Sequence, residues 1–103
     1  MYAMTGKLIT QIGKRTALVD ILLRASAVVA QLHGCRAYIV NEDVADETGV
    51  VVFEMWDDKE AHDASLKDER VRSLIAEAMP LMGGAPGGAE LRVVGGYGVD
   101  QTV

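Results

Sequence analysis

The segment Val50–Trp56 limits the possible folds more than any other part of this sequence. It reads Val-Val-Val-Phe-Glu-Met-Trp, a short and nearly continuous apolar run that is typical of a β-strand. Side chains alternate between the two faces of a strand, so Val51, Phe53 and Met55 share one face and Glu54 lies on the other. An apolar run of this kind is expected where both faces of a strand are covered by other parts of the protein.

The segments around this strand show patterns of their own. Between residues 15 and 32 the apolar positions step by three and four, which predicts a helix, and Gly34 supplies a left-handed stop after it. Asp57 and Asp58 are suitable N-cap residues for a helix that follows the central strand. The predicted elements are strands over 1–12, 35–40, 50–56 and 90–94, and helices over 15–32, 59–66 and 68–81.

This order of elements is β-α-β-β-α-β, which predicts an α+β, ferredoxin-like fold with a four-stranded antiparallel sheet. The helices of such a fold cover only one face of the sheet. A second copy of the chain, packed through the same sheet face about a two-fold axis, would cover the other face. We therefore predict a homodimer through the sheet faces, which makes a dimeric α-β barrel.

Composition limits the possible partners. The chain has 103 residues, half of them hydrophobic, and we expect one domain over 1–103 with its core at about 5–95. The net charge is −5 and the basic residues are scattered, so no nucleic-acid partner is expected. No apolar stretch reaches the roughly 20 residues of a membrane span, and no signal peptide is recognised. With one cysteine and no zinc-type spacing, we expect no metal and a cytoplasmic location.

Several stretches resemble the antibiotic-biosynthesis monooxygenase family, in the same order along the chain. They include Gly6-Lys7-Leu8, the helix that closes with His33-Gly34-Cys35, and the strand end with the acidic helix start over Phe53–Leu66. The likeness ends with the helix over 71–81 and the strand Leu91-Arg92-Val93-Val94. The Glu-x-Trp strand end followed by the acidic helix start is its most specific part.

The resemblance implies a function. Enzymes of this family generally work without metal, flavin or haem, so the expected cofactor is none, and the expected substrate is a small electron-rich aromatic such as a quinol, an anthrone or a polyketide-like compound. The deprotonated substrate itself gives an electron to dioxygen, and the protein binds, orients and deprotonates it. The alternative is a dimeric ligand-binding or stress-associated module of the same fold without catalysis.

Trp56 and His62 are the candidate catalytic residues. The Trp56 ring could form the wall of a pocket and stack on a planar substrate, or it could simply fill the core at a strand end. His62 lies six residues later, and an imidazole suits proton transfer near neutrality. The other interpretation of His62 is a solvated histidine on a surface helix.

The candidate substrate-binding residues are Tyr38, Glu54, Ser65 and Met55. Tyr38 could line the pocket with its phenol or be an ordinary half-buried strand residue. Glu54 shares a strand face with the tryptophan and could act as a base or form a salt bridge, and Met55 could form part of an adaptable apolar pocket or fill the core.

Haem degradation is not expected. The haem-degrading relatives that this sequence resembles use an Asn on the first strand and a haem-ligating His nine residues after a Trp. Here Leu8 falls near the first position and Ser65 occupies the second, and serine is a poor haem ligand. Gly83–Gly88 lacks the Lys-Ser/Thr of a phosphate-binding loop and is predicted to be a flexible loop, while the residues from Gly95 onward are predicted to form a tail.

Overall fold

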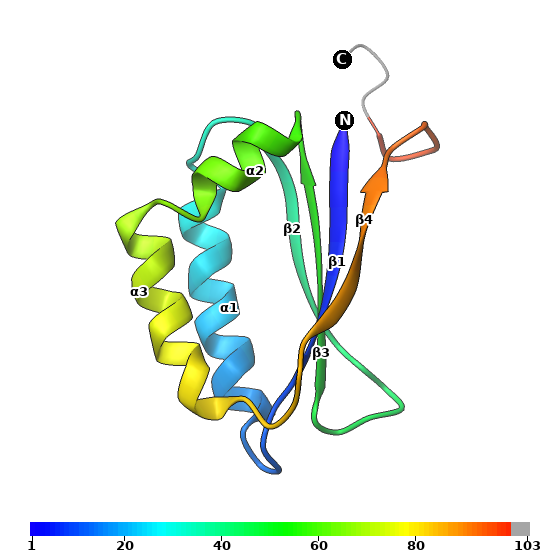
Figure 1. Cartoon of the computed structure of the whole chain (residues 1–103). Helices are drawn as coiled ribbons and strands as arrows, with labels where there is room; N and C mark the ends of the chain where they lie inside the picture. The colour runs from blue at the N-terminus through cyan, green and yellow to red at the C-terminus, as the bar shows by residue number, and fades with distance from the viewer. Residues whose placement is uncertain (100–103) are drawn as a thin grey trace.

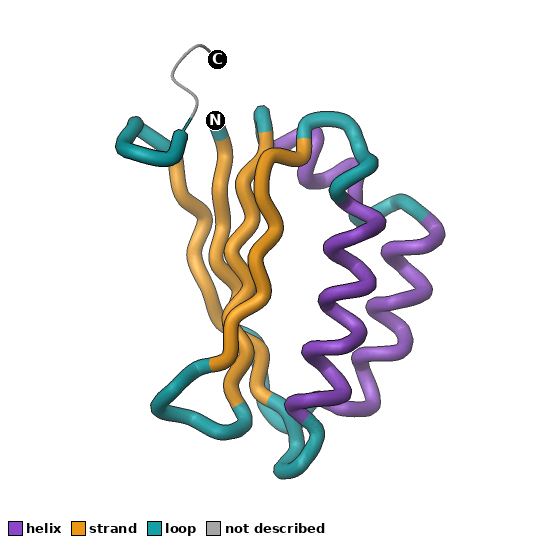
Figure 2. The backbone as a smooth tube through the Cα atoms, turned by 180° about the vertical axis from the view of Figure 1, so that it is seen from behind, coloured by secondary structure: helices purple, strands orange, loops and turns teal. Residues whose placement is uncertain are grey.

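Four strands form one antiparallel sheet with every helix on the same side of it, as the computed structural model of residues 1–99 shows (Figures 1 and 2). The strand order is β2-β3-β1-β4. This is the predicted α+β, ferredoxin-like arrangement. The elements are β1 (Tyr2–Ile9), α1 (Arg15–Val29), β2 (Cys35–Glu42), β3 (Gly49–Trp56), α2 (Lys59–Ser65), α3 (Glu69–Ala78), a 3₁₀ turn (Met79–Leu81) and β4 (Gly87–Arg92).

The bounds of several elements differ from the sequence prediction. β1 ends at Ile9 instead of residue 12, and α1 ends at Val29 instead of residue 32. The flexible loop predicted over 83–88 is wrong at its end, because Gly87 and Gly88 pair with β1 and begin β4. Strand pairing is made by backbone hydrogen bonds, which need no side chain. Two glycines can therefore be part of a strand even though their residue type does not predict one. Residues 100–103, the end of the predicted tail, lie outside the described residues.

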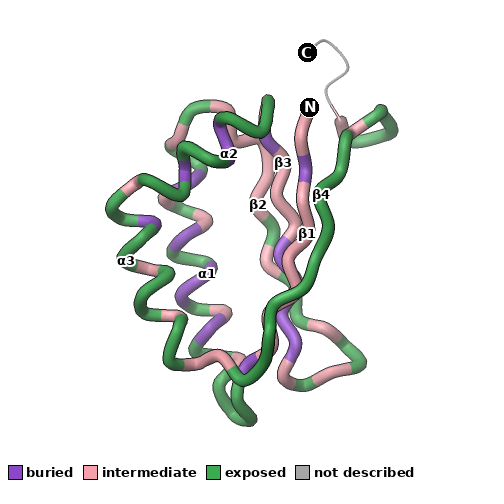
Figure 3. The backbone as a smooth tube through the Cα atoms, in the orientation of Figure 1, coloured by how far each residue is buried: buried purple, intermediate pink, exposed green. Residues whose placement is uncertain are grey.

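Buried residues lie on both the sheet and the helices (Figure 3). Between these two layers, buried side chains form two hydrophobic clusters that make up the core. One cluster lies under the middle of α1, and the other surrounds Trp56 near the start of α2. Tyr38 packs against both clusters and so joins them. The first cluster is Leu18, Leu22, Val50 and Val52, and the second is Val29, Trp56, Ala61 and Val71.

No helix covers the other face of the sheet among residues 1–99 (Figure 2). This face carries Val51, Phe53 and Met55 of β3, which alternate with the core-facing residues. Ile39 on β2 and Leu91 on β4 lie on the same face and are 51% and 42% exposed. β4 is exposed along its whole length (Figure 3).

The connection between β3 and α2 is held by contacts with Gly34, just before β2, and with Arg36 on β2. Gly34 adopts the left-handed conformation predicted for it, with φ of 84°. Its carbonyl accepts a hydrogen bond from the Asp57 backbone N–H at 2.8 Å, and the Arg36 guanidinium binds the Asp57 carboxylate at 2.5 Å. Asp58 caps α2 by accepting from the Ala61 backbone N–H at 2.8 Å. These contacts set α2 over the end of β3.

The helices of the described part of the chain include none that is both long and apolar enough to cross a lipid bilayer.

Candidate functional site

Trp56 is the largest of the fully buried side chains among the described residues, and none of its surface is exposed. Its ring packs in the cluster with Val29, Ala61 and Val71. The indole N–H donates a hydrogen bond to Oε1 of Glu54 at 3.1 Å. The structure therefore shows Trp56 as a core residue that also holds a carboxylate, and its ring face is not open to a ligand within this chain.

Glu54 and His62 face each other beside this tryptophan. The Nε2 atom of His62 lies 4.0 Å from the same Oε1 atom of Glu54, and the His62 ring meets the Trp56 ring edge-on at 6.1 Å between centroids. The side chains of Glu54 and His62 are only 17% and 9% exposed. The interpretation of His62 as a solvated surface residue is therefore wrong, because the side of α2 that carries His62 packs against the end of β3.

The second ring nitrogen of His62 contacts Asp63, a residue that the sequence analysis did not single out. Nδ1 lies 3.0 Å from Oδ1 of Asp63. The hydrogen bond with His62 and the positive charge of Lys59 hold the pKa of the Asp63 carboxyl below its ordinary value. Asp63 is therefore ionised near neutrality, and an ionised carboxylate only accepts hydrogen bonds.

Three side chains from separate elements extend this polar cluster toward solvent. The Tyr2 ring lies 5.4 Å from the His62 ring, and its hydroxyl donates to Oε2 of Glu90 at 2.9 Å. The Lys59 ammonium lies 3.5 Å from the Asp63 carboxylate and 3.6 Å from that of Glu90. Tyr2 pairs with Trp56 in the β1–β3 register and with Arg92 in the β1–β4 register. Only a knowledge of this strand register could have predicted that Tyr2 lies beside His62.

Tyr38 lies beside the cluster, because it pairs with Glu54 in the β2–β3 register. Burial, and then the negative charge of Glu54, raises the pKa of the Tyr38 phenol, so the phenol keeps its proton near neutrality. The same two causes raise the pKa of the Cys35 thiol. Cys35 is therefore protonated near neutrality and is a poor nucleophile.

Ser65 and Met55 are placed differently from the other candidates. Ser65 is buried on α2, but its hydroxyl donates to the backbone carbonyl of His62 at 2.5 Å and so is used within the helix. Met55 alternates to the opposite face of the sheet from Glu54 and Trp56 and pairs with Ala3 there. The structure does not bring Met55 to the cluster.

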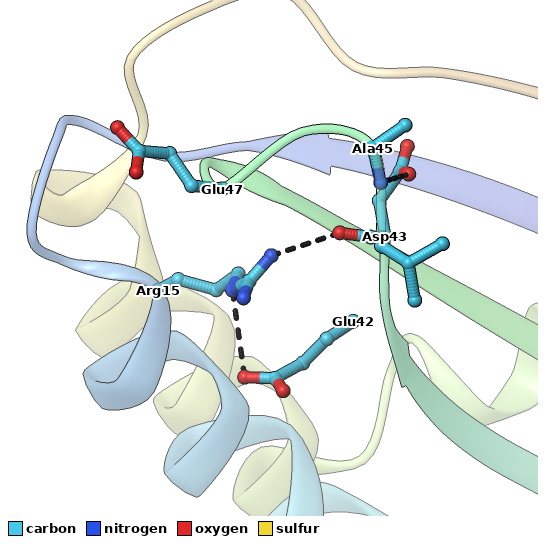
Figure 4. A pocket seen from close by; sticks show the side chains of 6 residues that line it. Arg15, Glu42, Asp43, Ala45 and Glu47 are labelled. Carbon is cyan, nitrogen blue, oxygen red and sulfur yellow. Dashed lines mark hydrogen bonds and ion pairs between the residues drawn. The ribbon is translucent and has the colours of Figure 1, made fainter.

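Two open hollows lie elsewhere on the surface. One, of about 530 Å³, lies between the start of α1 and the β2–β3 turn and is lined by Arg15, Glu42, Asp43, Val44, Ala45 and Glu47 (Figure 4). Arg15 donates there to the backbone carbonyls of Asp43 and Asp46 at 3.1 and 2.9 Å. Val50 pairs with Glu42 at this end of β3, roughly 20 Å along the strand from Trp56.

The second hollow, of about 480 Å³, lies between α1 and α3 on the side away from the sheet and includes Arg24 and Glu77. Neither hollow is lined by a residue of the Glu54 cluster. Within residues 1–99, no three His, Cys, Asp or Glu side chains are grouped so that they could hold a metal ion.

The whole fold has many relatives among solved structures. A candidate antibiotic biosynthesis monooxygenase from Chloroflexus aurantiacus J-10-fl is 34% identical, with a TM-score of 0.85, and the match covers 96% of this chain and 98% of that one. Candidate enzymes of the same name from Deinococcus radiodurans and Caulobacter crescentus CB15 share the fold at 20% and 23% identity, with TM-scores of 0.82 and 0.84. Those matches cover 97% and 91% of this chain, and 99% and 90% of theirs.

The comparison by sequence reaches the same group of proteins. Among curated proteins, none matches the chain. A sequence model of the family described as antibiotic biosynthesis monooxygenase matches residues 1–77, which include the Glu-x-Trp strand end and the whole of α2. The chain belongs to the antibiotic biosynthesis monooxygenase family.

Proposed function

We propose that this protein is a cofactor-independent monooxygenase that oxidises an electron-rich aromatic, a quinol, an anthrone or a polyketide-like compound, with dioxygen. The observation that carries the proposal is the pair of Glu54 and His62, two proton acceptors that lie 4.0 Å apart and are almost buried on the helix side of the sheet. Membership of the family supplies the class of reaction. The chemistry needs a base near an apolar surface, and this pair provides one.

The proposed reaction begins with proton transfer. An anthrone-type substrate gives a proton from its acidic CH₂ group to the Glu54–His62 pair, and the anion that remains gives one electron to dioxygen. The two radicals combine to form a carbon–oxygen bond, and the returned proton makes a hydroperoxide. Loss of water from it leaves a carbonyl, so that CH₂ and O₂ become C=O and H₂O. In this proposal Tyr38, a protonated phenol beside Glu54, donates a hydrogen bond to a substrate oxygen.

A ligand-binding module without catalysis is the second candidate, and two observations favour it. Trp56 has no exposed surface to stack on a substrate. The two hollows described above lie away from the cluster. A protein of this kind would bind a planar aromatic compound and leave its rate of oxidation unchanged.

We also propose that the protein is a homodimer through the uncovered face of the sheet. Ile39 and Leu91 are exposed there beside the partly buried side chains of Val51, Phe53 and Met55. A second copy, rotated about a two-fold axis, would bury this apolar face against its own equivalent.

The test is dioxygen uptake by dialysed, metal-free protein with a panel of reduced quinones and anthrones, measured against the rate without protein. We expect uptake well above that rate for at least one compound. Glu54→Gln keeps the shape and the acceptor oxygen of the side chain but removes the base, and we expect it to lower the rate by about 10²-fold or more.

The matched control is Glu60→Gln. Glu60 is an exposed carboxylate on α2 that makes no ion pair among the described residues, so this change should leave uptake unaltered. Uptake at the protein-free rate for every compound, together with quenching of the single tryptophan on titration with the same compounds, would favour the binding module instead.

A further inference from the structure

We propose that Asp63 is a positioning residue that keeps the hydrogen of neutral His62 on Nδ1, so that Nε2 and the Glu54 carboxylate face each other as two acceptors for one incoming proton. The catalytic meaning of this arrangement rests on the proposed function. The arrangement itself is a property of the folded chain and can be tested without any substrate.

Asp63 and His62 are in direct side-chain contact. Nδ1 of His62 and Oδ1 of Asp63 are 3.0 Å apart, which is a hydrogen-bond distance. Neighbouring residues on a helix do not normally face each other, so this contact is not a general consequence of helical geometry. The Lys59 ammonium, 3.5 Å from the other oxygen of Asp63, helps to hold the carboxylate in this place. An ionised carboxylate accepts only, so the hydrogen must be on Nδ1.

The position of that hydrogen decides what Nε2 can do. In a neutral imidazole with hydrogen on Nδ1, Nε2 carries a lone pair, and the Nε2 atom lies 4.0 Å from Oε1 of Glu54. Two acceptors that face each other in a partly desolvated site attract a proton. A proton taken from a substrate would therefore have both acceptors within reach, while the Trp56 N–H keeps Oε1 in place.

Other charged and titratable groups around His62 come from every element that packs near it. Lys59 and Asp63 lie on α2, Glu54 on β3, Tyr2 on β1 and Glu90 on β4. Exposure rises along the chain of contacts, from 9% for the His62 side chain to 50% for Asp63 and 55% for Lys59. Asp63 and Lys59 therefore lie between the nearly buried His62 ring and solvent.

The experiment is nitrogen-15 NMR of histidine-labelled protein at alkaline pH, where imidazoles are neutral and the chemical shifts tell which ring nitrogen carries hydrogen. We expect the His62 hydrogen on Nδ1 in the wild type. Asp63→Asn keeps an acceptor oxygen and should preserve this form, whereas Asp63→Ala should move the hydrogen to Nε2. A His62→Gln spectrum identifies the signal, and the exposed His33 serves as an internal reference that Asp63→Ala should not change.

Glu60→Ala is the matched control on the same helix, and it should leave the His62 spectrum unchanged. Asp63 is itself exposed, so its variants are expected to fold, and circular dichroism checks this. Hydrogen on Nε2 of His62 in the wild type, or the same tautomer in Asp63→Ala as in the wild type, would overturn the proposal.

Dioxygen uptake separates this proposal from the proposed function. If the protein oxidises its substrate, Asp63→Ala should lower kcat by about tenfold or more with little change in KM, and Asp63→Asn should lower it less. If no compound is oxidised but the tautomers respond as expected, the proposed function fails and the role of Asp63 stands. If oxidation is found and wild-type His62 carries its hydrogen on Nε2, the role of Asp63 fails and the proposed function stands.

Discussion

Trp56 serves the core and the candidate site at the same time. The ring has no exposed surface, and its N–H is bonded to the carboxylate of Glu54. A change at this position therefore has two consequences that must be separated. Truncation to alanine leaves a large cavity, which costs about 3–5 kcal/mol in a protein core and would confuse loss of structure with loss of activity.

Trp56→Phe separates the two roles, because it keeps an aromatic ring in the core and removes the N–H donor. We expect the free energy of unfolding to fall by about 1–3 kcal/mol, since Glu54 loses a hydrogen bond in a partly buried place. Urea unfolding followed by circular dichroism measures this. Dioxygen uptake should fall as well, because Oε1 of Glu54 is no longer held. Wild-type stability and wild-type uptake in this variant would contradict the role given to the N–H.

Part of this site follows from the sequence and part does not. Alternation along a strand is enough to place Glu54 and Trp56 on one face. The burial of His62 depends on how α2 is set over the strand end, which the contacts of Gly34 and Asp57 determine in three dimensions. Asp63 follows His62 directly, and the spacing rules of a helix give no reason to expect their contact.

Among the secondary-structure elements, the position of α2 depends on Gly34, which lies between α1 and β2 and is in close contact with α2. A Cβ atom at this position would lie 2.7 Å from the Cβ of Ala61, and φ is 84°. Gly13, before α1, has nearly the same φ of 82° but open space around it. The two glycines therefore share the backbone requirement and differ in the close approach of α2.

Gly34→Ala and Gly13→Ala form a matched pair. Each should lose about 1–2 kcal/mol of unfolding free energy from the left-handed backbone. Gly34→Ala should lose more than Gly13→Ala, because α2 must shift to admit the methyl group. The shift should also change the His62 signals in the NMR spectrum. Equal losses in the two variants, with an unchanged His62 spectrum, would show that the approach of α2 to Gly34 does not position the site.

The sequence predicts most elements and their order because periodicity and caps are local signals. The helix α1 has a periodic apolar pattern, the strand β3 is a nearly continuous apolar run, and Asp58 caps α2 as expected. The start of β4 was missed, since its pairing with β1 is made by the backbone of two glycines. Long-range pairing of this kind leaves no mark on side-chain periodicity.

At the scale of the whole molecule, acid should destabilise the protein. Hydrogen bonds hold the pKa of several carboxyl groups below the ordinary values of 3.8 for Asp and 4.5 for Glu. Because these groups bind protons less readily in the folded chain, the stability they contribute is complete above their ordinary pKa and is lost as pH falls through the lower folded pKa. The groups are Asp43, Asp46, Asp63, Asp68 and Glu77.

We therefore expect the urea midpoint to be constant above about pH 5 and to fall as the pH is lowered below 4. Urea titrations across this range measure it. A midpoint that rises on acidification would contradict the assignment of these carboxylates as stabilising in their ionised form.

The uncovered sheet face gives a second prediction at this scale. Ile39 lies on this face and is 51% exposed, and Leu23 lies on the outer side of α1 and is 55% exposed. Light scattering should show a dimer for the wild type and for Leu23→Lys, and a shift toward monomer for Ile39→Lys, which places a charge in the proposed interface. A monomeric wild type would contradict the proposed dimer. A dimer that only Leu23→Lys disrupts would show that the interface includes α1 and not the sheet face.

In the proposed reaction this chain inserts one oxygen atom from dioxygen into an aromatic substrate, with Glu54 and His62 as the base. The decisive experiment is mass spectrometry of the product formed under ¹⁸O₂ with a reduced quinone or an anthrone. We expect a product that carries one ¹⁸O atom, formed faster than without protein and lost in Glu54→Gln but not in Glu60→Gln. An unlabelled product formed with accumulation of hydrogen peroxide, or a rate equal to that without protein, would contradict it.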